Sequence, residues 1–584
     1  MRRLRILLLT HAFNALSQRL FIELGEAGHE VSVELDIADA VTEEAVALWR
    51  ADLVIAPYLK RRLPESVWRR CPCLIVHPGP PGDGGPSSLD WAVLRALPRW
   101  GVTVLQATAE VDAGPVWAWR EFAMRAQATK SSLYRHELTR EAVAAVLEAV
   151  ARFAGGTPAA SMAMAAHAWP HGPTGWQPLL TRAQRTIDWH ADDSATVLQK
   201  VRSADGAPGA VASLDGRVWR LFDLHEAGAD AAQARQGAAP GTLLARRGPA
   251  VLVATRDAAL WVGHLRGLGE TPLDALKLPA VDALGAAAQA LPERAVPLQR
   301  GDGAWDELRY SCRGEPGARV GWLEFDFHNG AMGERQCRRL VQALRDLRDE
   351  PLQVLVLAGG ADFFGNGIHL HLIEAATHRD GDSAADASWR NIEAIDDVVL
   401  ELLRMTDRLT VAALRGNAGA GGCFVALGAD EVWAHDGVVL NPHYKNMGNL
   451  YGSEYWTYTL PRRVGAERAD AIMQRRLPTG ARQAQRDGLI DACFGVDAAS
   501  FEDLARERAA RLAADPGLPQ RLATKAARRA ADEALRPLAE HRQAELQRMQ
   551  RNFYGFDPSY HVARHHFVHR KPHAWTPRHL ARHR

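Results

Sequence analysis

Two glycine-dense loops place backbone N–H groups where an oxyanion can be stabilised. The segment Thr410–Asp430, TVAALRGNAGAGGCFVALGAD, runs from an apolar stretch through a glycine-rich loop into an apolar segment of helical length. Pro351–Leu370, PLQVLVLAGGADFFGNGIHL, contains a second such loop. Glycine lets the backbone approach a ligand and point its N–H groups outward, and paired N–H groups stabilise a polarised carbonyl such as that of a thioester. Either loop alone can also be an ordinary strand-to-helix turn.

A histidine and an aspartate near the N-terminus form a second candidate site. His77 follows the short apolar run Leu74–Val76 and opens a loop rich in glycine and proline, and Asp112 lies in a loop after the next predicted strand. Open α/β sheets bind ligands at the carboxyl ends of their strands. A carboxylate there can orient an imidazole for proton transfer. A turn histidine and a turn-capping aspartate would give the same pattern.

A block of polar and aromatic residues follows the later glycine loop. Asn441–Arg463, NPHYKNMGNLYGSEYWTYTLPRR, contains Tyr444 and Glu454, with His443 as a reserve candidate. A tyrosine and a carboxylate beside one carbonyl carbon can move a proton from carbon or to sulfur. The alternative is an aromatic packing segment beneath a helix.

The composition of the chain is that of an ordinary multidomain protein without a membrane span. Its 584 residues exceed what one hydrophobic core supports, and 47% of them are hydrophobic. A net charge of +1 gives no electrostatic argument for nucleic acid. No segment approaches about 18 uninterrupted apolar residues. The six scattered cysteines fit free thiols in a reducing compartment, so we expect a cytoplasmic location.

Strand and helix patterns predict an α/β multidomain protein. Alternating strands and helices over the first part predict a doubly wound parallel sheet, and turn signals such as Asp215-Gly216 separate short strands in a small β-rich domain. A new α/β pattern, with long amphipathic helices at its end, follows a linker rich in alanine and proline. The expected boundaries are 1–155 for the first α/β domain, 176–270 for the β-rich domain, 271–315 for the linker, 316–550 for the second α/β domain and 551–584 for a basic, histidine-rich, partly disordered tail.

The first 270 or so residues resemble the formyltransferases that use 10-formyltetrahydrofolate. The resemblance rests on the order of His77-Pro-Gly-Pro and Asp112-Ala-Gly-Pro-Val, and on weaker phrases such as Arg185-Thr-Ile-Asp-Trp189. It implies that His77 and Asp112 transfer the formyl group. It also implies a folate pocket formed by Asn14, Pro57, Tyr58, Ser87 and Ser88.

Two departures from the formyltransferase pattern concern the site itself. Ile75 occupies the position of the family's asparagine, so an amide donor worth about 10²–10³ in rate is missing. Either a backbone N–H replaces that donor, or the formyl acceptor is not the usual amine. Asp83-Gly84-Gly85 stands where the family has a basic residue.

The later part of the chain resembles the crotonase (enoyl-CoA hydratase/isomerase) superfamily. The glycine loops correspond to the family's two oxyanion loops and place the backbone donors on Ile368 and Gly421. The positions of the two hydratase glutamates are Phe424 and His443, which excludes plain water addition. The basic run 519–530 is a candidate for the phosphates of coenzyme A. The residues that the resemblance places around coenzyme A are Phe364, Asn366, Gly367 and Gly422.

Taken together, nearly the whole chain is similar to the HypX (HoxX) family of hydrogenase maturation factors. The phrases that carry this similarity are HPGPPGDGGPSSLDWA, FFGNGIHL, NPHYKNMGNLYGSEYWTYTLPRRVG and NFYGFDPSYHVAR. The resemblance implies 10-formyltetrahydrofolate and coenzyme A as cofactors, and synthesis of the carbon monoxide ligand of [NiFe]-hydrogenase. Formyl-CoA has no α-carbon, so enolate chemistry is impossible, and hydrolysis to formate or decarbonylation to carbon monoxide remains. Decarbonylation suits a pair such as Tyr444 and Glu454 beside two oxyanion donors. Proteins that assemble the iron–cyanide–carbonyl group are the implied partners.

Two other functions remain open from the sequence. The chain can be a folate-dependent formyltransferase acting on an amine, or a non-enzymatic scaffold that binds coenzyme A or folate. The tail adds one further pattern, since His561, His565 and His569 share a helical face that can bind nickel or zinc. No carboxylate follows Asp557, and no metal site is assigned.

Overall fold

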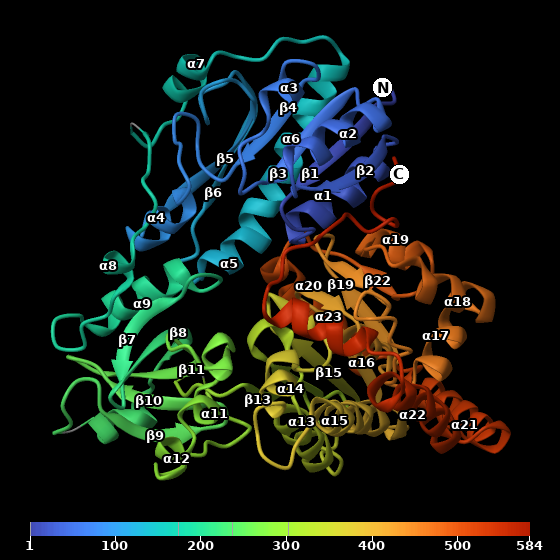
Figure 1. Cartoon of the computed structure of the whole chain (residues 1–584). Helices are drawn as coiled ribbons and strands as arrows, with labels where there is room; N and C mark the ends of the chain where they lie inside the picture. Colours follow the sequence, from blue (N-terminus) through green and yellow to red (C-terminus); the bar gives the residue numbers. More distant parts are fainter. Residues whose placement is uncertain (1, 173, 236, 302) are drawn as a thin grey trace. The chain divides into compact units, whose positions relative to one another are not determined.

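The computed structural model describes residues 2–584 except 173, 236 and 302, and it divides into two compact units (Figure 1). The first unit consists of Met1–Leu224, Thr255–Asp257 and Pro572–Arg584. The second consists of His225–Ala254 and Ala258–Lys571. Among the described residues, every helix is too short or too polar to span a bilayer.

A six-stranded sheet in the order β2-β1-β3-β4-β5-β6 forms the centre of the first unit. Its strands are β1 (Arg5–Thr10), β2 (Glu30–Leu35), β3 (Leu53–Tyr58), β4 (Cys73–His77), β5 (Arg99–Gln106) and β6 (Val116–Ala123). β1 to β4 pair in parallel, as predicted, whereas β5 and β6 pair antiparallel. Continuous apolar runs such as RILLLT in β1 suit parallel strands that are covered on both faces. β3 and β4 therefore end at the same edge of the sheet, with Tyr58 and His77 as their last residues.

Helices cover this sheet and lead to a β-hairpin. The helix α6 packs against β5, β6 and α1, and α2 packs against β1, β2 and α3. The helices are α1 (Ala15–Glu26), α2 (Asp39–Trp49), α3 (Glu65–Trp68), α4 (Ser88–Leu94), α5 (Lys130–Leu133), α6 (Thr139–Ala154), α7 (Met162–His167), α8 (Arg182–Arg185) and α9 (Ser194–Ala204). The hairpin strands β7 (Ala210–Leu214) and β8 (Arg217–Glu226) pair antiparallel.

The last residues of the chain are ordered on β2 of the first unit. Leu580 accepts a hydrogen bond from the N–H of Val33, and the Thr576 hydroxyl accepts one from Leu35. The buried Glu34 carboxylate binds His583 at 2.8 Å. Burial alone would raise the pKa of Glu34, but hydrogen bonds from His583 and Thr576 lower it. The expectation of a partly disordered tail is therefore wrong for this segment, because backbone pairing and a buried ion pair hold it.

The second unit begins with short antiparallel strands. β10 (Ala250–Ala254) pairs with β9 (Leu243–Arg247) and β11 (Ala259–Gly267), and β12 (Leu278–Pro279) pairs with β11. The short helices α10 (Ala229–Ala232), α11 (Ala280–Leu284) and α12 (Ala286–Gln289) belong to the same part of the chain. Much of the expected linker is structured, since it contains α11, α12 and β13 (Leu308–Arg313).

Two sheets form the core of the second unit. The larger has the order β13-β14-β15-β17-β19-β22, parallel except for the β13–β14 pair, and the smaller has the order β16-β18-β20-β21. The large-sheet strands are β14 (Val320–Phe325), β15 (Val354–Gly359), β17 (Leu409–Leu414), β19 (Glu431–Ala434) and β22 (Ala492–Cys493). The small-sheet strands are β16 (Phe363–Gly365), β18 (Asn417–Gly419), β20 (Val439–Asn441) and β21 (Thr479–Gly480). Each of β15, β17 and β19 is followed by one strand of the small sheet. This repetition places the loops after β16 and β18 side by side.

Helices surround these sheets, and the later ones include the long helices that the amphipathic C-terminal sequence predicts. Their ranges are α13 (Glu334–Asp346), α14 (Leu370–Ala376), α15 (Ala384–Arg404), α16 (Gly421–Leu427), α17 (Trp456–Val464), α18 (Ala466–Arg475), α19 (Ala481–Arg486), α20 (Ala498–Ala513), α21 (Leu518–Leu535), α22 (Leu538–Tyr554) and α23 (Ser559–Val568). α22 packs against α15 and α17, and α23 packs against α14 and α22. α23 therefore lies against α14, the helix that follows the glycine loop of Ile368.

Candidate active sites

His77 lies between two carboxylates at the end of β4. Its Nε2 atom is 2.8 Å from Asp83 Oδ2, and its Nδ1 atom is 3.6 Å from Asp112 Oδ2. The same Asp112 oxygen accepts the N–H of Gly85 at 3.0 Å, which fixes it against the loop. The structure thus brings the predicted pair together, with a separation slightly longer than a direct hydrogen bond.

Asp83 is a site residue that the sequence interpretation missed. Its side chain is buried, and within the described residues its Oδ1 atom has no hydrogen-bond partner. A buried acceptor left unpaired is costly, and such atoms are typical of functional sites. The sequence did contain a signal: Asp83 lies only six residues after His77, in a loop of glycines and prolines that can fold back on itself.

Gly79 makes the approach of Asp83 to His77 possible. A Cβ atom added there would lie 2.1 Å from Asp83 Oδ2 and 2.6 Å from His77 Nε2. The Thr103 hydroxyl donates to the Gly79 carbonyl at 2.8 Å and anchors the turn to β5. Any side chain at this position would therefore separate the acid from the imidazole.

Asn14, Pro57 and Tyr58, expected to line a folate pocket, lie at the ends of β1 and β3 or just beyond them. Asn14 caps α1 by accepting the N–H of Ser17 at 3.0 Å, and its amide donates to the Tyr134 hydroxyl at 3.2 Å. Pro57 and Tyr58 end β3, the neighbour of β4. These three residues belong to the strand edge that carries His77, and their contact with folate stays a prediction.

Ser87 and Ser88, the other two expected folate contacts, already use their hydroxyl groups within the protein. Ser88 donates to the Pro78 carbonyl at 2.9 Å. The Ser87 oxygen accepts the N–H of Leu180 at 3.1 Å. Both side chains are buried. Ser88 holds the His77 loop against α4, and Ser87 holds the chain at Leu180; a direct role of either in binding stays a prediction.

Ile368 and Gly421, the predicted oxyanion donors, lie on adjacent loops. β16 pairs in parallel with β18. A Cβ added at Gly367 would lie 3.1 Å from the Gly421 nitrogen, and one at Gly422 would lie 2.0 Å from the Gly365 carbonyl oxygen. Glycine is therefore required for the two loops to touch. Within the described residues, the N–H groups of Ile368 and Gly421 donate to no protein acceptor, as oxyanion donors must.

Tyr444 and Glu454 form a buried hydrogen-bonded pair beside these donors. The Tyr444 hydroxyl donates to Glu454 Oε2 in a short hydrogen bond. The two residues are only 6% and 2% exposed, respectively. A Cβ added at Gly421 would lie 2.5 Å from Glu454 Oε1. One carboxylate oxygen thus faces the phenol, and the other faces the second donor loop.

Burial tunes the acidity of this pair. It raises the pKa of Glu454 to about 7, although hydrogen bonds from Tyr444 and Ser453 oppose the effect. Burial, followed by the negative charge of Glu454, raises the pKa of Asp396 to about 8 and holds that of Tyr444 well above its usual range. Asp396 Oδ1 accepts the N–H of Glu454 at 2.7 Å. A carboxyl that titrates near neutrality can both take and give a proton.

Helix α22 holds the loop that carries Glu454. Asn552 Oδ1 accepts the N–H of Tyr451 at 3.0 Å, and Met549 Sδ accepts that of Gly452 at 3.1 Å. The buried Glu545 carboxylate accepts the N–H of Tyr455 at 2.9 Å. Asn552 begins the phrase NFYGFDPSYHVAR, which sequence reasoning used only as a family signature. Its side chain holds the loop that carries Glu454.

The backbone of this loop is held in an unfavourable conformation. Glu454 and Tyr455 have φ angles of +63° and +57°, in the left-handed region that favours glycine. Such residues cost about 1–3 kcal/mol each and persist where the surrounding structure enforces them. Gly452 precedes them at φ +95°, where a Cβ would lie 2.1 Å from the Tyr444 ring. Hydrogen bonds from the loop N–H groups to Asp396 on α15 and Glu545 on α22 supply the constraint that keeps Glu454 in place.

Phe424 and His443 occupy the two positions that carry glutamates in hydratases. Phe424 is fully buried and stacks on Tyr444, with ring centroids 5.0 Å apart and an interplanar angle of 15°. It therefore orients the phenol instead of supplying an acid. His443 is buried next to Tyr444, and the hydrogen bond to Glu454 comes from the phenol. His443 stays a reserve candidate.

Phe364 and Asn366, expected near coenzyme A, make contacts inside the protein that hold the loop of Ile368 in place. Phe364 packs edge-on against Phe325 in the core, with ring centroids 5.1 Å apart. Any ligand contact would fall to its backbone. The Asn366 amide donates to the Asn329 carbonyl at 2.8 Å. Binding roles for both stay predictions.

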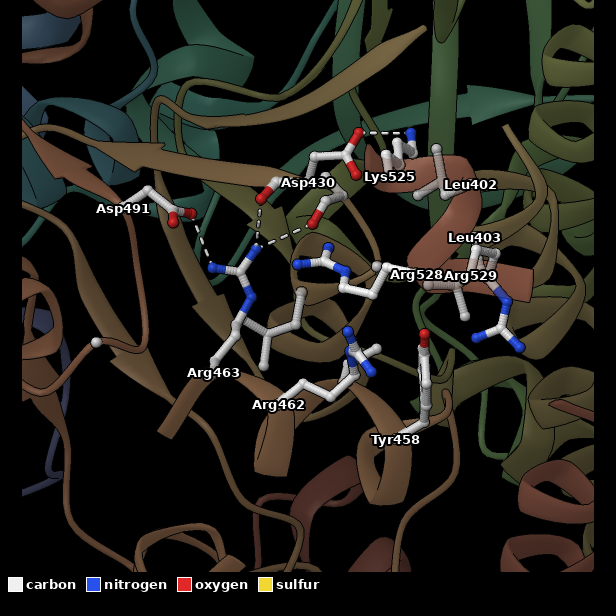
Figure 2. Close-up of a pocket in the computed structure, with 15 residues that line it drawn as sticks. Leu402, Leu403, Asp430, Tyr458, Arg462, Arg463, Asp491, Lys525, Arg528 and Arg529 are labelled. Atoms are coloured by element: carbon white, nitrogen blue, oxygen red, sulfur yellow. Dashed lines mark hydrogen bonds and ion pairs between the residues drawn. The ribbon is translucent and has the colours of Figure 1, made fainter. Parts of the chain in front are cut away.

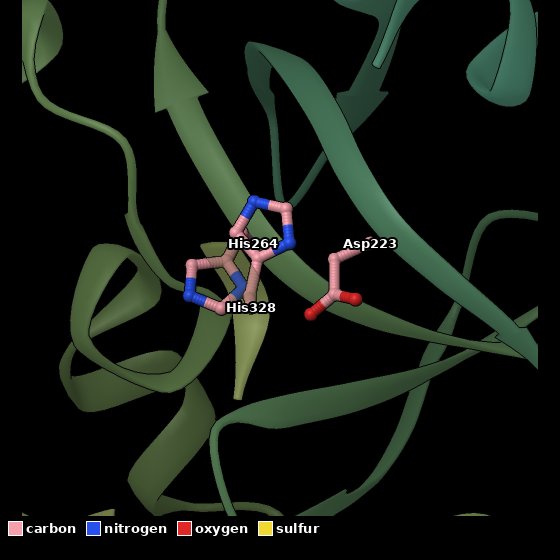
Figure 3. Close-up of side chains that lie close together, drawn as sticks. All are labelled: Asp223, His264 and His328. Atoms are coloured by element: carbon pink, nitrogen blue, oxygen red, sulfur yellow. The ribbon is translucent and has the colours of Figure 1, made fainter. Parts of the chain in front are cut away.

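His369, the residue after Ile368, fixes the start of α14. His369 Nδ1 accepts the N–H of Leu372 at 3.2 Å and so caps the helix. Burial, together with the neighbouring His264, lowers the pKa of His369 to about 3. His264 on β11 and His328 lie with ring centroids 4.3 Å apart (Figure 3). A neutral His369 holds the Ile368 loop as a cap and does not act as an acid.

The basic helix α21 lines a pocket of about 330 Å³ with α17 (Figure 2). Lys525 lies 2.6 Å from Asp430, and Arg463 lies 2.7 Å from Asp491, so part of this positive charge is neutralised locally. The pocket reaches Gly428, just after the C-terminal end of α16, whereas Gly421 begins that helix. The pocket and the oxyanion donors therefore lie at opposite ends of α16, and contact of the basic run with coenzyme A phosphates stays a prediction.

Known proteins are similar to this chain both in its separate parts and over its whole length. A family model described as enoyl-CoA hydratase/isomerase matches residues 326–578, and one described as the C-terminal domain of formyl transferases matches residues 179–279. The hydrogenase maturation factor HoxX of Bradyrhizobium diazoefficiens is 52% identical over 583 residues, which cover 100% of this chain and 97% of the relative. The chain belongs to the HoxX/HypX family of hydrogenase maturation factors.

Solved structures of the HoxX/HypX family have the same fold. Two crystal structures of HypX from Aquifex aeolicus match with a TM-score of 0.92 and 44% identity, covering 100% of this chain and 99% of theirs. One of them is a complex with tetrahydrofolic acid. The family and the formyltransferase-like and crotonase-like fold predicted from the sequence are thereby confirmed. The roles of the individual site residues stay predictions.

Proposed function

We propose that this chain makes carbon monoxide for hydrogenase maturation in two reactions, with 10-formyltetrahydrofolate and coenzyme A as substrates. In the first, His77 takes the thiol proton of coenzyme A while sulfur attacks the formyl carbon. The carbon–nitrogen bond to folate then breaks, and the imidazolium returns its proton to the leaving nitrogen. Asp83 and Asp112, on either side of the ring, stabilise the transient positive charge.

The second reaction splits formyl-CoA. The N–H groups of Ile368 and Gly421 bind the thioester oxygen, and the Glu454 carboxylate removes the formyl proton. The electron pair of that C–H bond stays on carbon as the lone pair of carbon monoxide, and the carbon–sulfur bond breaks to release thiolate. Tyr444 protonates the thiolate and regains a proton from Glu454. No oxidant or reductant is needed.

The observation that carries this proposal is the Tyr444–Glu454 pair lying against Gly421 in a crotonase-like unit. Phe424 replaces an acid that water addition needs, while two backbone donors remain. The two glycine loops touch, which brings backbone nitrogen atoms of both loops close to the Glu454 carboxylate. In the other unit, the unpaired Oδ1 atom of buried Asp83 offers an acceptor for a donor on a bound substrate.

Separating the two reactions tests the proposal. We expect Glu454→Gln to accumulate formyl-CoA from formyl-tetrahydrofolate and coenzyme A without releasing carbon monoxide. We expect His77→Gln to form no formyl-CoA but to release carbon monoxide when formyl-CoA is supplied. Chromatography of the thioesters and trapping of the gas by reduced haemoglobin measure both. Carbon monoxide release by Glu454→Gln at the wild-type rate would refute the second reaction, and formyl-CoA formation by His77→Gln at that rate would refute the first.

A further inference from the structure

A carboxylate and two imidazoles converge on one point of the second unit, where α23 packs against α14. Glu374 Oε1 lies 2.9 Å from His565 Nδ1 and 3.1 Å from His569 Nε2. All three atoms lie within 4.8 Å of one another. His565 on α23 and His569, which caps the C-terminal end of this helix, are four residues apart and lie on the same face, with ring centroids 4.2 Å apart. None of these groups takes part in the two reactions proposed above.

The sequence showed the histidines but not their partner. His561, the third histidine on the same helical face, is occupied elsewhere, because Arg564 donates to its Nδ1 atom at 2.6 Å and its Nε2 atom bonds the Phe553 carbonyl at 2.9 Å. Its place is taken by Glu374, which lies about 190 residues earlier in the chain. Glu374 thus supplies the carboxylate that residues 558–584 lack.

We propose that Glu374, His565 and His569 bind one divalent transition-metal ion. Two imidazole nitrogens and one carboxylate oxygen form a ligand set that suits Zn²⁺, Co²⁺ or Ni²⁺, with water completing the coordination. Metal–ligand bonds of about 2.0–2.1 Å place tetrahedral ligand atoms about 3.3–3.4 Å apart. The observed separations of 2.9 and 3.1 Å thus need to open by only a few tenths of an ångström.

The surroundings of Glu374 prepare its carboxylate for this role. Arg564 Nε donates to the other oxygen, Oε2, at 2.8 Å and leaves Oε1 directed at the two rings. The side chain of Glu374 is 4% exposed, whereas those of His565 and His569 are 47% and 17% exposed. The carboxylate is thus shielded, and an ion reaches it from the histidine side.

Metal binding at this point would connect the C-terminal helix to the first donor loop. Glu374 lies on α14, which begins two residues after the proposed oxyanion donor Ile368. An ion shared between α14 and α23 would add a bond between elements that already pack together. The expected effect is a more stable α14, and hence a structural role for the ion.

Titration of the full-length protein, first treated with a chelator, tests this site. We expect one Co²⁺ per chain, seen by its visible ligand-field absorption, displaced by Zn²⁺, and accompanied by a higher melting temperature. His569→Ala and His565→Ala should each weaken Co²⁺ binding at least about tenfold. His566→Ala is the matched control, because this exposed histidine of the same helix lies outside the ligand set.

Two results would overturn the proposal. One is Co²⁺ binding of wild-type strength in the His565→Ala/His569→Ala double variant, which would place the ion on other histidines. The other is the absence of Co²⁺ binding to the wild-type protein at millimolar metal. Circular dichroism of each variant checks that α23 is retained. If an alanine variant unfolds, His569→Gln replaces it, since glutamine keeps the side-chain bulk and removes the imidazole.

Discussion

Replacing Tyr444 by phenylalanine removes one oxygen atom from the proposed decarbonylation site. The ring remains to stack on Phe424, so the packing of the loop is kept. What is lost is the hydrogen bond to Glu454 Oε2 and the proton that the phenol would give to sulfur. The variant therefore separates chemistry from folding at a position where the side chain is only 6% exposed.

The magnitude follows from the hydrogen bond and the acidity of Glu454. A hydrogen bond to a charged group contributes about 1.5–3 kcal/mol, which corresponds to about a 10- to 150-fold loss of decarbonylation rate at neutral pH. Burial raises the pKa of Glu454 to about 7, and the Tyr444 hydrogen bond opposes this rise. Without the phenol, that pKa rises further. The pH–rate profile should move to higher pH by about one to two pH units.

The assay is single-turnover decay of supplied formyl-CoA across a pH series, with carbon monoxide trapped by reduced haemoglobin. Tyr554→Phe is the matched control, because its hydroxyl bonds Asp386 at an exposed position away from Glu454. We expect this control to retain the wild-type rate and profile. A Tyr444→Phe protein with the wild-type rate and an unshifted profile would refute the role given to the pair.

Three further substitutions test the geometry of the two sites. Burial raises the pKa of Glu454 to about 7 and that of Asp396 to about 8, so between about pH 4.5 and 8 the unfolded chain binds fewer protons than the folded one. The stability of the protein therefore falls as the pH rises through this window, and Asp396→Asn should make that fall less steep. Melting temperatures measured across the window give the slope. Gly79→Ala should reduce formyl-CoA formation by about 10²-fold or more, because its Cβ would lie 2.1 Å from Asp83 Oδ2; an unchanged transfer rate would argue against an aspartate–histidine pair. Gly421→Ala should lower decarbonylation by about 10²–10³-fold through displacement of Glu454 and the donor loop, measured as decay of supplied formyl-CoA.

Features encoded within one short segment were predictable from the sequence. Gly367 and Gly421 predict that two backbone segments come close together, and His77 predicts the end of a strand. Both predictions depend only on residues that are neighbours in the sequence. The amphipathic C-terminal sequence likewise predicted the long helices seen as α20, α21 and α22. Tyr444 and Glu454 were identified within one segment, ten residues apart, and they bond to each other.

Features that depend on the folded path of the chain were not predictable. Asp396 on α15 and Glu545 on α22 hold the Glu454 loop from sequence separations of 58 and about 90 residues. Glu374 meets His565 across 191 residues. No periodicity or motif relates such partners, because the packing of helices brings them together. Asp83 was missed for a different reason: it lies only six residues after His77, and its contact with the ring depends on the absence of a Cβ at Gly79.

The most direct test of the account follows the formyl carbon itself. Wild-type protein is incubated with coenzyme A and formyl-tetrahydrofolate whose formyl carbon carries a heavy isotope, and the gas and the solution are both examined by mass spectrometry and by the infrared band of haemoglobin-bound carbon monoxide. We predict labelled carbon monoxide in an amount equal to the folate consumed, with coenzyme A required but regenerated. Label recovered as formate, or on an amine, would contradict the account.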